Sequence, residues 1–192
     1  MRNPATLPLQ RGTSMIEVLV TIVILAFGLL GLVGLQSRLQ ISEMDAYQRA
    51  QGLILLEDMA NRIASNRTDA ASYVTANTLG TGMTCPATVD TTAHRDLGEW
   101  CNALQGASET KTVASLTSRV GAFIGGRGCV ESLGSGEYLV TVAWQGMTPV
   151  SAPPASVACG KDSYDSASGT GSCINDLCRR VLTTIVRIAT LT

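Results

Sequence analysis

The stretch Gln10-Arg11-Gly12-Thr13-Ser14-Met15-Ile16-Glu17-Val18-Leu19 decides the fold of this 192-residue chain. It connects a short leader, whose charged residues are Arg2 and Arg11, to an apolar run with no charged residue between positions 18 and 35. A helix over these positions is about 27 Å long at roughly 1.5 Å per residue, close to the thickness of a bilayer's hydrocarbon core. We therefore predict an N-terminal helix with a transmembrane segment over about residues 15–35.

Glu17 lies at the beginning of this apolar run. A carboxylate in a membrane helix costs free energy unless its side chain reaches the headgroups or finds a partner. A plain signal anchor explains the basic leader, which holds the N-terminus in the cytoplasm, but it does not require Glu17. A cleaved secretory signal requires a small-residue cleavage site after the run, and Ala26 before Phe27-Gly28 is a poor candidate. A membrane subunit that assembles through Glu17 accounts for both features.

Gly28, Gly31 and Gly34 are spaced three residues apart within the run. This spacing places them roughly on one helix face, where small side chains let a neighbouring helix approach. Glycine is also common in membrane helices in general, so the pattern has two explanations. Each glycine lowers helix stability by about 1 kcal/mol relative to alanine, which predicts softening near residues 28–34.

The helical pattern continues beyond the apolar run, and no proline occurs from position 13 to position 64. One helix of about 50 residues is therefore expected, ending near residues 66–69. Its expected apolar face, which should carry the globular part, lies opposite charged residues such as Arg49 and Asp58. That face consists of Leu39, Ala46, Ala50, Leu53, Leu56, Ala60 and Ile63.

Six cysteines lie in the part of the chain that would be exported: Cys85, Cys101, Cys129, Cys159, Cys173 and Cys178. This distribution favours three disulfides formed in an oxidising periplasm. Zinc fits less well, because four residues separate the closest pair and His94 is the only histidine. No Cys-x-x-Cys redox motif occurs. Six cysteines allow fifteen pairings, and we expect Cys85 to pair with Cys101 and the other four among themselves.

The region after the long helix should begin with a loop over residues 72–92, held by Cys85. Asp96 is expected to cap a short helix whose apolar positions have helical spacing. These positions are Leu97, Trp100, Cys101 and Leu104, with Trp100 in the core. A second short helix is expected over residues 116–123, from the spacing of Leu116, Val120 and Phe123.

A small antiparallel sheet should complete the globular head. Residues 129–131 and 137–145 flank a Gly134-Ser135-Gly136 turn and predict a hairpin. Residues 179–192 are rich enough in β-branched side chains for a terminal strand. Residues 146–173 form a Pro-, Ser- and Gly-rich connection. The predicted fold class is α+β, a long N-terminal helix packed on a small antiparallel sheet with disulfide-stapled loops.

The composition points away from several function classes. Fourteen basic and fifteen acidic residues nearly cancel without clustering, so no nucleic-acid partner is predicted. No catalytic motif, phosphate loop or paired-carboxylate constellation occurs, so we expect no enzyme, no catalytic residue, no metal, no cofactor and no small-molecule substrate. DNA uptake by residues 146–173 is disfavoured because Lys161 is their only basic residue.

The segment Gly12-Thr13-Ser14-Met15-Ile16-Glu17-Val18 resembles the class III signal of type IV pilins. In that family a prepilin peptidase cuts after the glycine, and a carboxylate is the fifth mature residue. The resemblance implies cleavage between Gly12 and Thr13, N-methylation of Thr13 and a role for Glu17 in subunit assembly. Thr13 departs from the phenylalanine that usually begins the mature chain, so methylation is less secure than cleavage. Gly34 stands where many major pilins carry a helix-bending proline.

Within this family the chain resembles minor pilins of the PilV kind. The matching segments are residues 14–19, 96–100, 138–144 and 178–181. The resemblance implies a subunit that, with other minor pilins, primes assembly of a type IV pilus and is incorporated with the major pilin, and so serves twitching motility and adhesion. Implied further partners are the prepilin peptidase, the membrane and the inner-membrane assembly platform.

The implied organisation is a leader over residues 1–12, a long helix over 13–66 and a periplasmic head over 67–192. The protein would cross the inner membrane once, with a cytoplasmic N-terminus and a periplasmic head, before it enters the pilus. One alternative is an I-type pseudopilin of type II secretion, which shares Ile16-Glu17-Val18-Leu19. The other is a tip adhesin that displays the connection over residues 146–173.

Overall fold

The computed structural model describes residues 14–107, 109–113, 116–119, 121, 124–166 and 170–189. Its internal contacts divide the chain into two units, Met1–Glu43 and Met44–Thr192, which we describe separately. Helix α1 (Met15–Ser65) is continuous over 51 residues and contributes to both units. The prediction of one uninterrupted N-terminal helix is therefore confirmed.

In the first unit, the described residues are the beginning of α1. Every side chain from position 14 to position 40 is exposed. Gly12 and Thr13, the residues of the expected cleavage site, lie outside the described residues, as does the rest of the expected leader. Their roles stay predictions.

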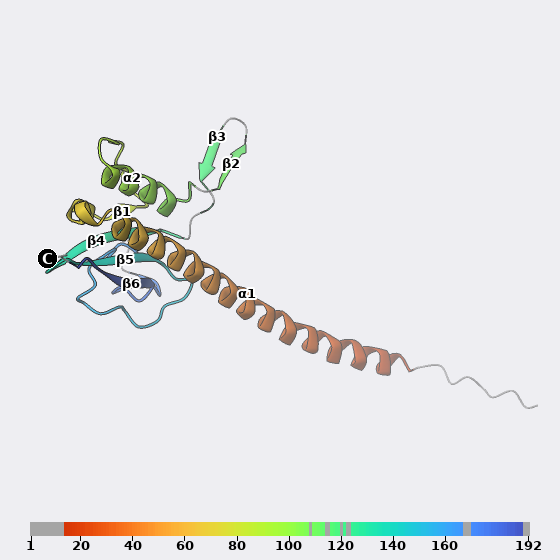
Figure 1. Ribbon diagram of the computed structural model, residues 1–192. Helices are drawn as coiled ribbons and strands as arrows, with labels where there is room; N and C mark the ends of the chain where they lie inside the picture. The colour runs from red at the N-terminus through yellow and green to blue at the C-terminus, as the bar shows by residue number, and fades with distance from the viewer. Residues whose placement is uncertain are drawn as a thin grey trace, which may run out of the picture. The chain divides into compact units, whose positions relative to one another are not determined.

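The second unit contains a four-stranded antiparallel sheet with the order β1-β4-β5-β6 (Figure 1). Its strands are β1 (Leu79–Gly80), β4 (Arg127–Gly134), β5 (Glu137–Gln145) and β6 (Arg179–Arg187). The predicted hairpin and terminal strand are confirmed as β4, β5 and β6. The central pairings place Val140 of β5 opposite Val130 of β4 and Thr184 of β6. The short strand β1, which the sequence pattern did not indicate, is added beside β4.

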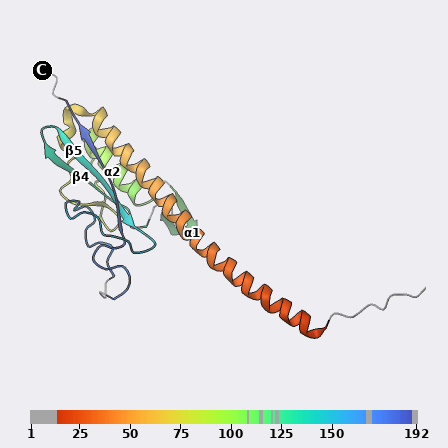
Figure 2. The same ribbon diagram turned by 90° about the horizontal axis from the view of Figure 1, so that it is seen from below.

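The later half of α1 packs across one face of this sheet (Figure 2). Leu56, Met59 and Ile63 share a buried core with Val130, Val140, Val142, Trp144 and Val186. Gly52 lies so close to the sheet that a Cβ atom there would be 3.1 Å from the Trp144 ring and 3.4 Å from Leu182. Burial of these apolar side chains is the main favourable term in holding helix and sheet together.

The expected apolar face of α1 was partly wrong. Leu56 and Ile63 are buried, but Leu53 is 40% exposed and Ala46 and Ala50 are also exposed. Gln48 and Gly52 are buried in their place. The physical reason is that α1 is apolar on more than one side. The large side chain of Trp144 packs where α1 has no side chain, at Gly52, and so this side of the helix faces the sheet.

Helix α2 (Thr92–Leu104) packs beside β1, β4 and the 3₁₀ helix η1 (Arg67–Tyr73). The expected cap at Asp96 was wrong, because the hydroxyl of Thr91 accepts the amide hydrogen of His94 and α2 begins one turn earlier. Trp100 is fully buried, as predicted. Its indole Nε1 donates a hydrogen bond of 2.8 Å to the carbonyl of Leu55, which joins α2 to α1.

Strands β2 (Thr110–Val113) and β3 (Leu116–Arg119) form a separate two-stranded antiparallel sheet. The helix expected over residues 116–123 was therefore wrong at its start, while Val120 and Phe123 lie outside the described residues. This sheet pairs Thr110 with Arg119 and Val113 with Leu116. Its β-branched residues favour a pleated strand, and this local preference outweighs the three- and four-residue spacing that predicted a helix.

Three disulfides close the second unit: Cys85–Cys101, Cys129–Cys159 and Cys173–Cys178. The expected first pair, and the pairing of the later four cysteines among themselves, are confirmed. The connection between β5 and β6 covers part of the sheet face opposite α1. A Cβ atom on Gly160 in this connection would lie 3.1 Å from the Cβ of Ala143 in β5.

Candidate functional site

Glu17 lies in the first turn of α1 and is exposed. Its backbone amide donates to the carbonyl of Ser14 at 2.9 Å, which closes the first helical turn. Among the described residues its carboxylate has no hydrogen bond or ion pair. A carboxylate at a helix N-terminus is stabilised by the helix dipole, but the apolar neighbours Ile16 and Val18 offer it no polar contact. Glu17 is therefore an exposed carboxylate at the boundary of the apolar stretch.

The apolar stretch after Glu17 buries none of its residues within the described chain. Ile24, Phe27 and Leu30 are each more than 60% exposed. A Cβ atom placed on Gly28, Gly31 or Gly34 would meet nothing within 4 Å. By length and composition this part of α1 is able to cross a membrane. Exposed apolar surface of this extent is typical of sites that contact a membrane or another protein.

In the second unit, α1 has an outward apolar face as well as the buried one. Tyr47 is 51% exposed, Leu53 is 40% exposed and Ile54 is 59% exposed, and Ala50 is also exposed. These residues follow helical spacing and form a surface that the sheet leaves uncovered. A second helix of similar pattern fits such a surface by ridge-into-groove packing.

Arg62, near the end of α1, joins three carboxylates. Its Nε donates to Asp58 at 3.0 Å, and its Nη1 donates to Asp96 at 2.7 Å and to Glu99 at 2.8 Å. Partial burial acts to lower the pKa of Arg62, but the hydrogen bonds to Glu99 and Asp96 outweigh it and the pKa is raised. This cluster attaches α2 to α1.

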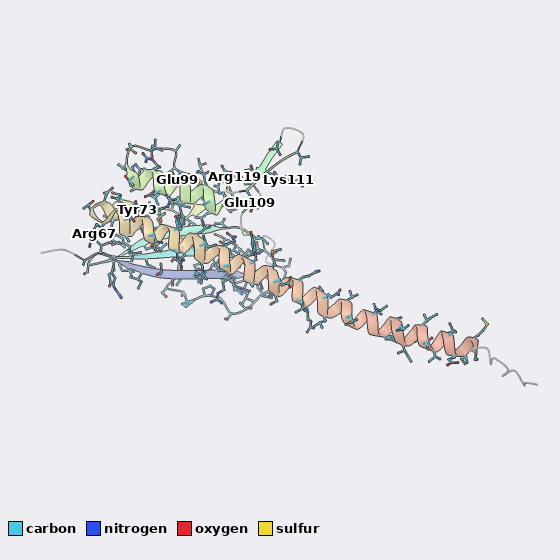
Figure 3. All side chains as sticks on the ribbon, turned by 45° about the vertical axis from the view of Figure 1, so that its right-hand side comes forward. Arg67, Tyr73, Glu99, Glu109, Lys111 and Arg119 are labelled. Atoms are coloured by element: carbon cyan, nitrogen blue, oxygen red, sulfur yellow. A yellow bond between two sulfur atoms is a disulfide. The ribbon has the colours of Figure 1, made fainter. Side chains whose placement is uncertain are left out.

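Tyr73 extends the same cluster from η1. Its hydroxyl donates a hydrogen bond to Asp96 and accepts one from Asn66 at 3.3 Å. Burial and the hydrogen bond to Asp96 raise the pKa of Tyr73 to about 12. Figure 3 shows that Tyr73 and Glu99 come from the neighbouring elements η1 and α2. The cluster joins α1, η1 and α2.

Arg179, at the start of β6, is the most deeply buried charged residue described, with 2% of its surface exposed. Its Nη1 donates to the carbonyls of Val157 at 2.7 Å and Cys159 at 3.1 Å, and its Nη2 lies 3.1 Å from the carboxylate of Asp176. The Nε atom has no partner among the described residues. The guanidinium therefore binds two backbone carbonyls in the middle of the connection between β5 and β6 and a carboxylate near its end.

Sequence reasoning missed the roles of Arg62 and Arg179. Arg62 follows Asp58 by one helical turn, a spacing that indicates an ion pair, but its contacts with α2 depend on tertiary packing. Arg179 directly follows Cys178, which places it at a disulfide without indicating that it is buried.

His94 and the cysteines form no metal site in the described residues, where no three His, Cys, Asp or Glu side chains gather suitably. The ring Nδ1 of His94 lies 2.6 Å from the carboxylate of Asp90, and this hydrogen bond lowers the pKa of Asp90. All six cysteines are in disulfides.

Comparison of the chain with protein-family models, with curated proteins and with solved structures finds no match.

Proposed function

We propose that the chain is a minor pilin that primes the assembly of a type IV pilus and is incorporated into it with other minor pilins and the major pilin. The observation that carries the proposal is Glu17, an exposed carboxylate at the start of an apolar stretch of α1 whose residues up to position 40 are all exposed. The spacing from Gly12 to Glu17 further supports it.

The proposed assembly step is a charge pairing between subunits. Cleavage after Gly12 frees the amine of Thr13, and Glu17 of a neighbouring subunit accepts it. A carboxylate and an ammonium that leave water together recover by mutual attraction part of the hydration that each loses. The pairing would set the axial position of each subunit. The exposed faces of α1 around Gly31 and Ile54 would then pack against helices of neighbouring subunits.

The proposed location follows from the same features. The leader and its two arginines remain in the cytoplasm, α1 crosses the inner membrane, and the disulfide-containing head lies in the periplasm. The assembled subunit then leaves the membrane with the pilus.

Substitution of Glu17→Val tests the proposal in cells that produce the chain. We expect normal processing after Gly12 and normal membrane insertion, but at least a tenfold loss of the subunit from sheared pili and of co-purification with other minor pilins. Glu43→Ala is the matched control, because Glu43 is an exposed carboxylate of the same unit outside the apolar run. Unchanged incorporation of the Glu17→Val protein would contradict the proposal. Capture of secretion pseudopilins in place of pilus subunits would favour the I-type pseudopilin instead.

A second candidate function is adhesion through the connection over residues 146–173. The contacts of Arg179 support it, because they fix the backbone of this connection and a fixed loop loses less entropy on binding. Deletion within the connection discriminates between the two roles. Loss of adhesion with intact pili favours the adhesin, whereas loss of pili favours the priming subunit.

A further inference from the structure

Cys173–Cys178 is the smallest of the three disulfide loops. Its cysteines are 5 positions apart, compared with 16 for Cys85–Cys101 and 30 for Cys129–Cys159. A short cross-link restricts the unfolded chain less than a long one, so it stabilises the protein least. By this measure Cys173–Cys178 is the disulfide whose loss the fold tolerates best.

Cys173 is also open to solvent through a cavity. Cys173 and Cys85 are both only partly buried, and Cys173 lines an open cavity of about 380 Å³ together with Gln145, Tyr164 and Ser172. Cys101 is fully buried, and Cys129 and Cys159 are 7% and 2% exposed. Cys85 packs against the hydrophobic core. A small thiol therefore reaches the sulfur of Cys173 more readily than those of the other two disulfides.

The ring closed by Cys173–Cys178 contains two residues in the left-handed backbone region. Asn175 and Asp176 have φ values of 53° and 61°, in a region that asparagine and aspartate adopt more often than other non-glycine residues. In this conformation the Asp176 carboxylate contacts Arg179 and accepts the amide of Asp162 at 2.9 Å. The amide of Asp176 in turn donates to Asp165 at 2.8 Å. The disulfide thus fixes the residue that connects the two sides of the loop.

We infer that Cys173–Cys178 is a redox-sensitive switch, whose reduction releases residues 174–178 from Arg179 and residues 160–166 from Asp176 while the helix and sheet stay folded. Once the ring opens, Asn175 and Asp176 leave the left-handed region and Asp176 withdraws from Arg179. A buried guanidinium without its counter-ion is strongly unfavourable, so the loop moves to let water reach it. Cys129–Cys159 still holds Cys159, and Gly160, at a φ of 69°, is the pivot. This inference does not depend on the proposed role in a pilus.

The reaction is ordinary thiol–disulfide exchange with a dithiol reductant. One thiolate of the reductant attacks the sulfur of Cys173, the bond between the two cysteines breaks, and Cys178 leaves as a thiolate that takes up a proton. The second thiol of the reductant then displaces Cys173. The two cysteines gain two electrons and two protons, and the reductant becomes a disulfide.

Titration of the full chain in detergent micelles with mixtures of reduced and oxidised dithiothreitol tests this inference. Thiol alkylation and peptide mapping identify the reduced pair, and hydrogen exchange measured by mass spectrometry follows the backbone. We expect Cys173 and Cys178 to become half-reduced at a reductant ratio at least tenfold lower than the other pairs. Amide exchange in residues 160–166 and 174–179 should then rise at least tenfold, with β4 and β5 unchanged.

Three variants distinguish the contribution of the Cys173–Cys178 disulfide from that of the Asp176–Arg179 ion pair. Cys173→Ala with Cys178→Ala should show fast exchange in these segments without reductant, whereas Cys85→Ala with Cys101→Ala should keep their response to reductant. Asp176→Asn should speed the exchange with the disulfide intact. Prior or simultaneous reduction of another pair would overturn the inference. So would unchanged exchange after reduction of Cys173–Cys178, or exchange that rises equally in β4 and β5.

Discussion

Cζ3 of Trp100 lies 2.6 Å from the position that a Cβ atom on Gly128 would occupy, and Cδ1 of Leu104 lies 2.8 Å from it. Gly128 is the second residue of β4, and Trp100 and Leu104 are fully buried on α2. The absence of a side chain at Gly128 therefore determines how closely α2 approaches the sheet.

Substitution of Gly128→Ala should lower the free energy of unfolding of the second unit by about 1–3 kcal/mol, the usual cost of an extra methyl group in a packed core. Denaturant titration followed by the fluorescence of Trp100 and Trp144 measures this change. Leu133→Ala is the control on the same strand, because Leu133 is 51% exposed. Its effect should stay within about 0.5 kcal/mol. An equally small effect of Gly128→Ala would show that α2 adjusts without cost.

Removal of the Arg62 side chain should loosen α2 from α1. Arg62→Met loses three charged hydrogen bonds, to Asp58, Asp96 and Glu99, and should lower the free energy of unfolding by about 1.5–3 kcal/mol. Arg62→Lys should also lower the free energy of unfolding, but by less than Arg62→Met. It keeps the positive charge, whereas an ammonium lacks the planar fork of donors. Arg67→Met, at an exposed arginine five residues later, should have little effect. Chemical denaturation of the three variants compares them directly.

Alkaline pH should destabilise the second unit. Burial raises the pKa of both Tyr73 and Tyr164 to about 12 from the ordinary value of 10.0, so the folded state holds these protons more tightly than the unfolded state. The contribution is fully present below pH 10.0 and is lost as the pH rises toward about 12. Unfolding midpoints over this range test the trend, and Tyr73→Phe should make it shallower. A stability that rises over the same range would contradict the assignment.

Loss of the Cys85–Cys101 disulfide should cost stability without preventing folding. For a loop of this size the chain-entropy model gives about 3 kcal/mol. The variant with Cys85→Ala and Cys101→Ala should therefore unfold at a lower denaturant concentration, while its circular dichroism at low denaturant stays that of the wild type. A midpoint equal to that of the wild type would show that the loop over residues 85–101 is fixed by packing alone.

Local sequence patterns predicted the elements whose causes are local. The charge-free run and the absence of proline predicted α1, and the turn at Ser135 between β-branched segments predicted β4 and β5. The helix expected over residues 116–123 failed because its spacing also suits an antiparallel strand, and Asp96 was mistaken for a cap that Thr91 provides.

The sequence by itself determined the membrane-length helix, the carboxylate Glu17 at its start and the α+β character of the head, because hydrophobic periodicity and charge act over neighbouring residues. Only the tertiary structure decided which side of α1 faces the sheet. Several sides of the helix are apolar, and the close contact of Gly52 with Trp144 determines which of them is buried. It also decided the burial of Arg179, whose partners at Val157 and Cys159 are about twenty residues away along the chain. Contacts between distant residues depend on how the whole chain packs, and no local pattern encodes them.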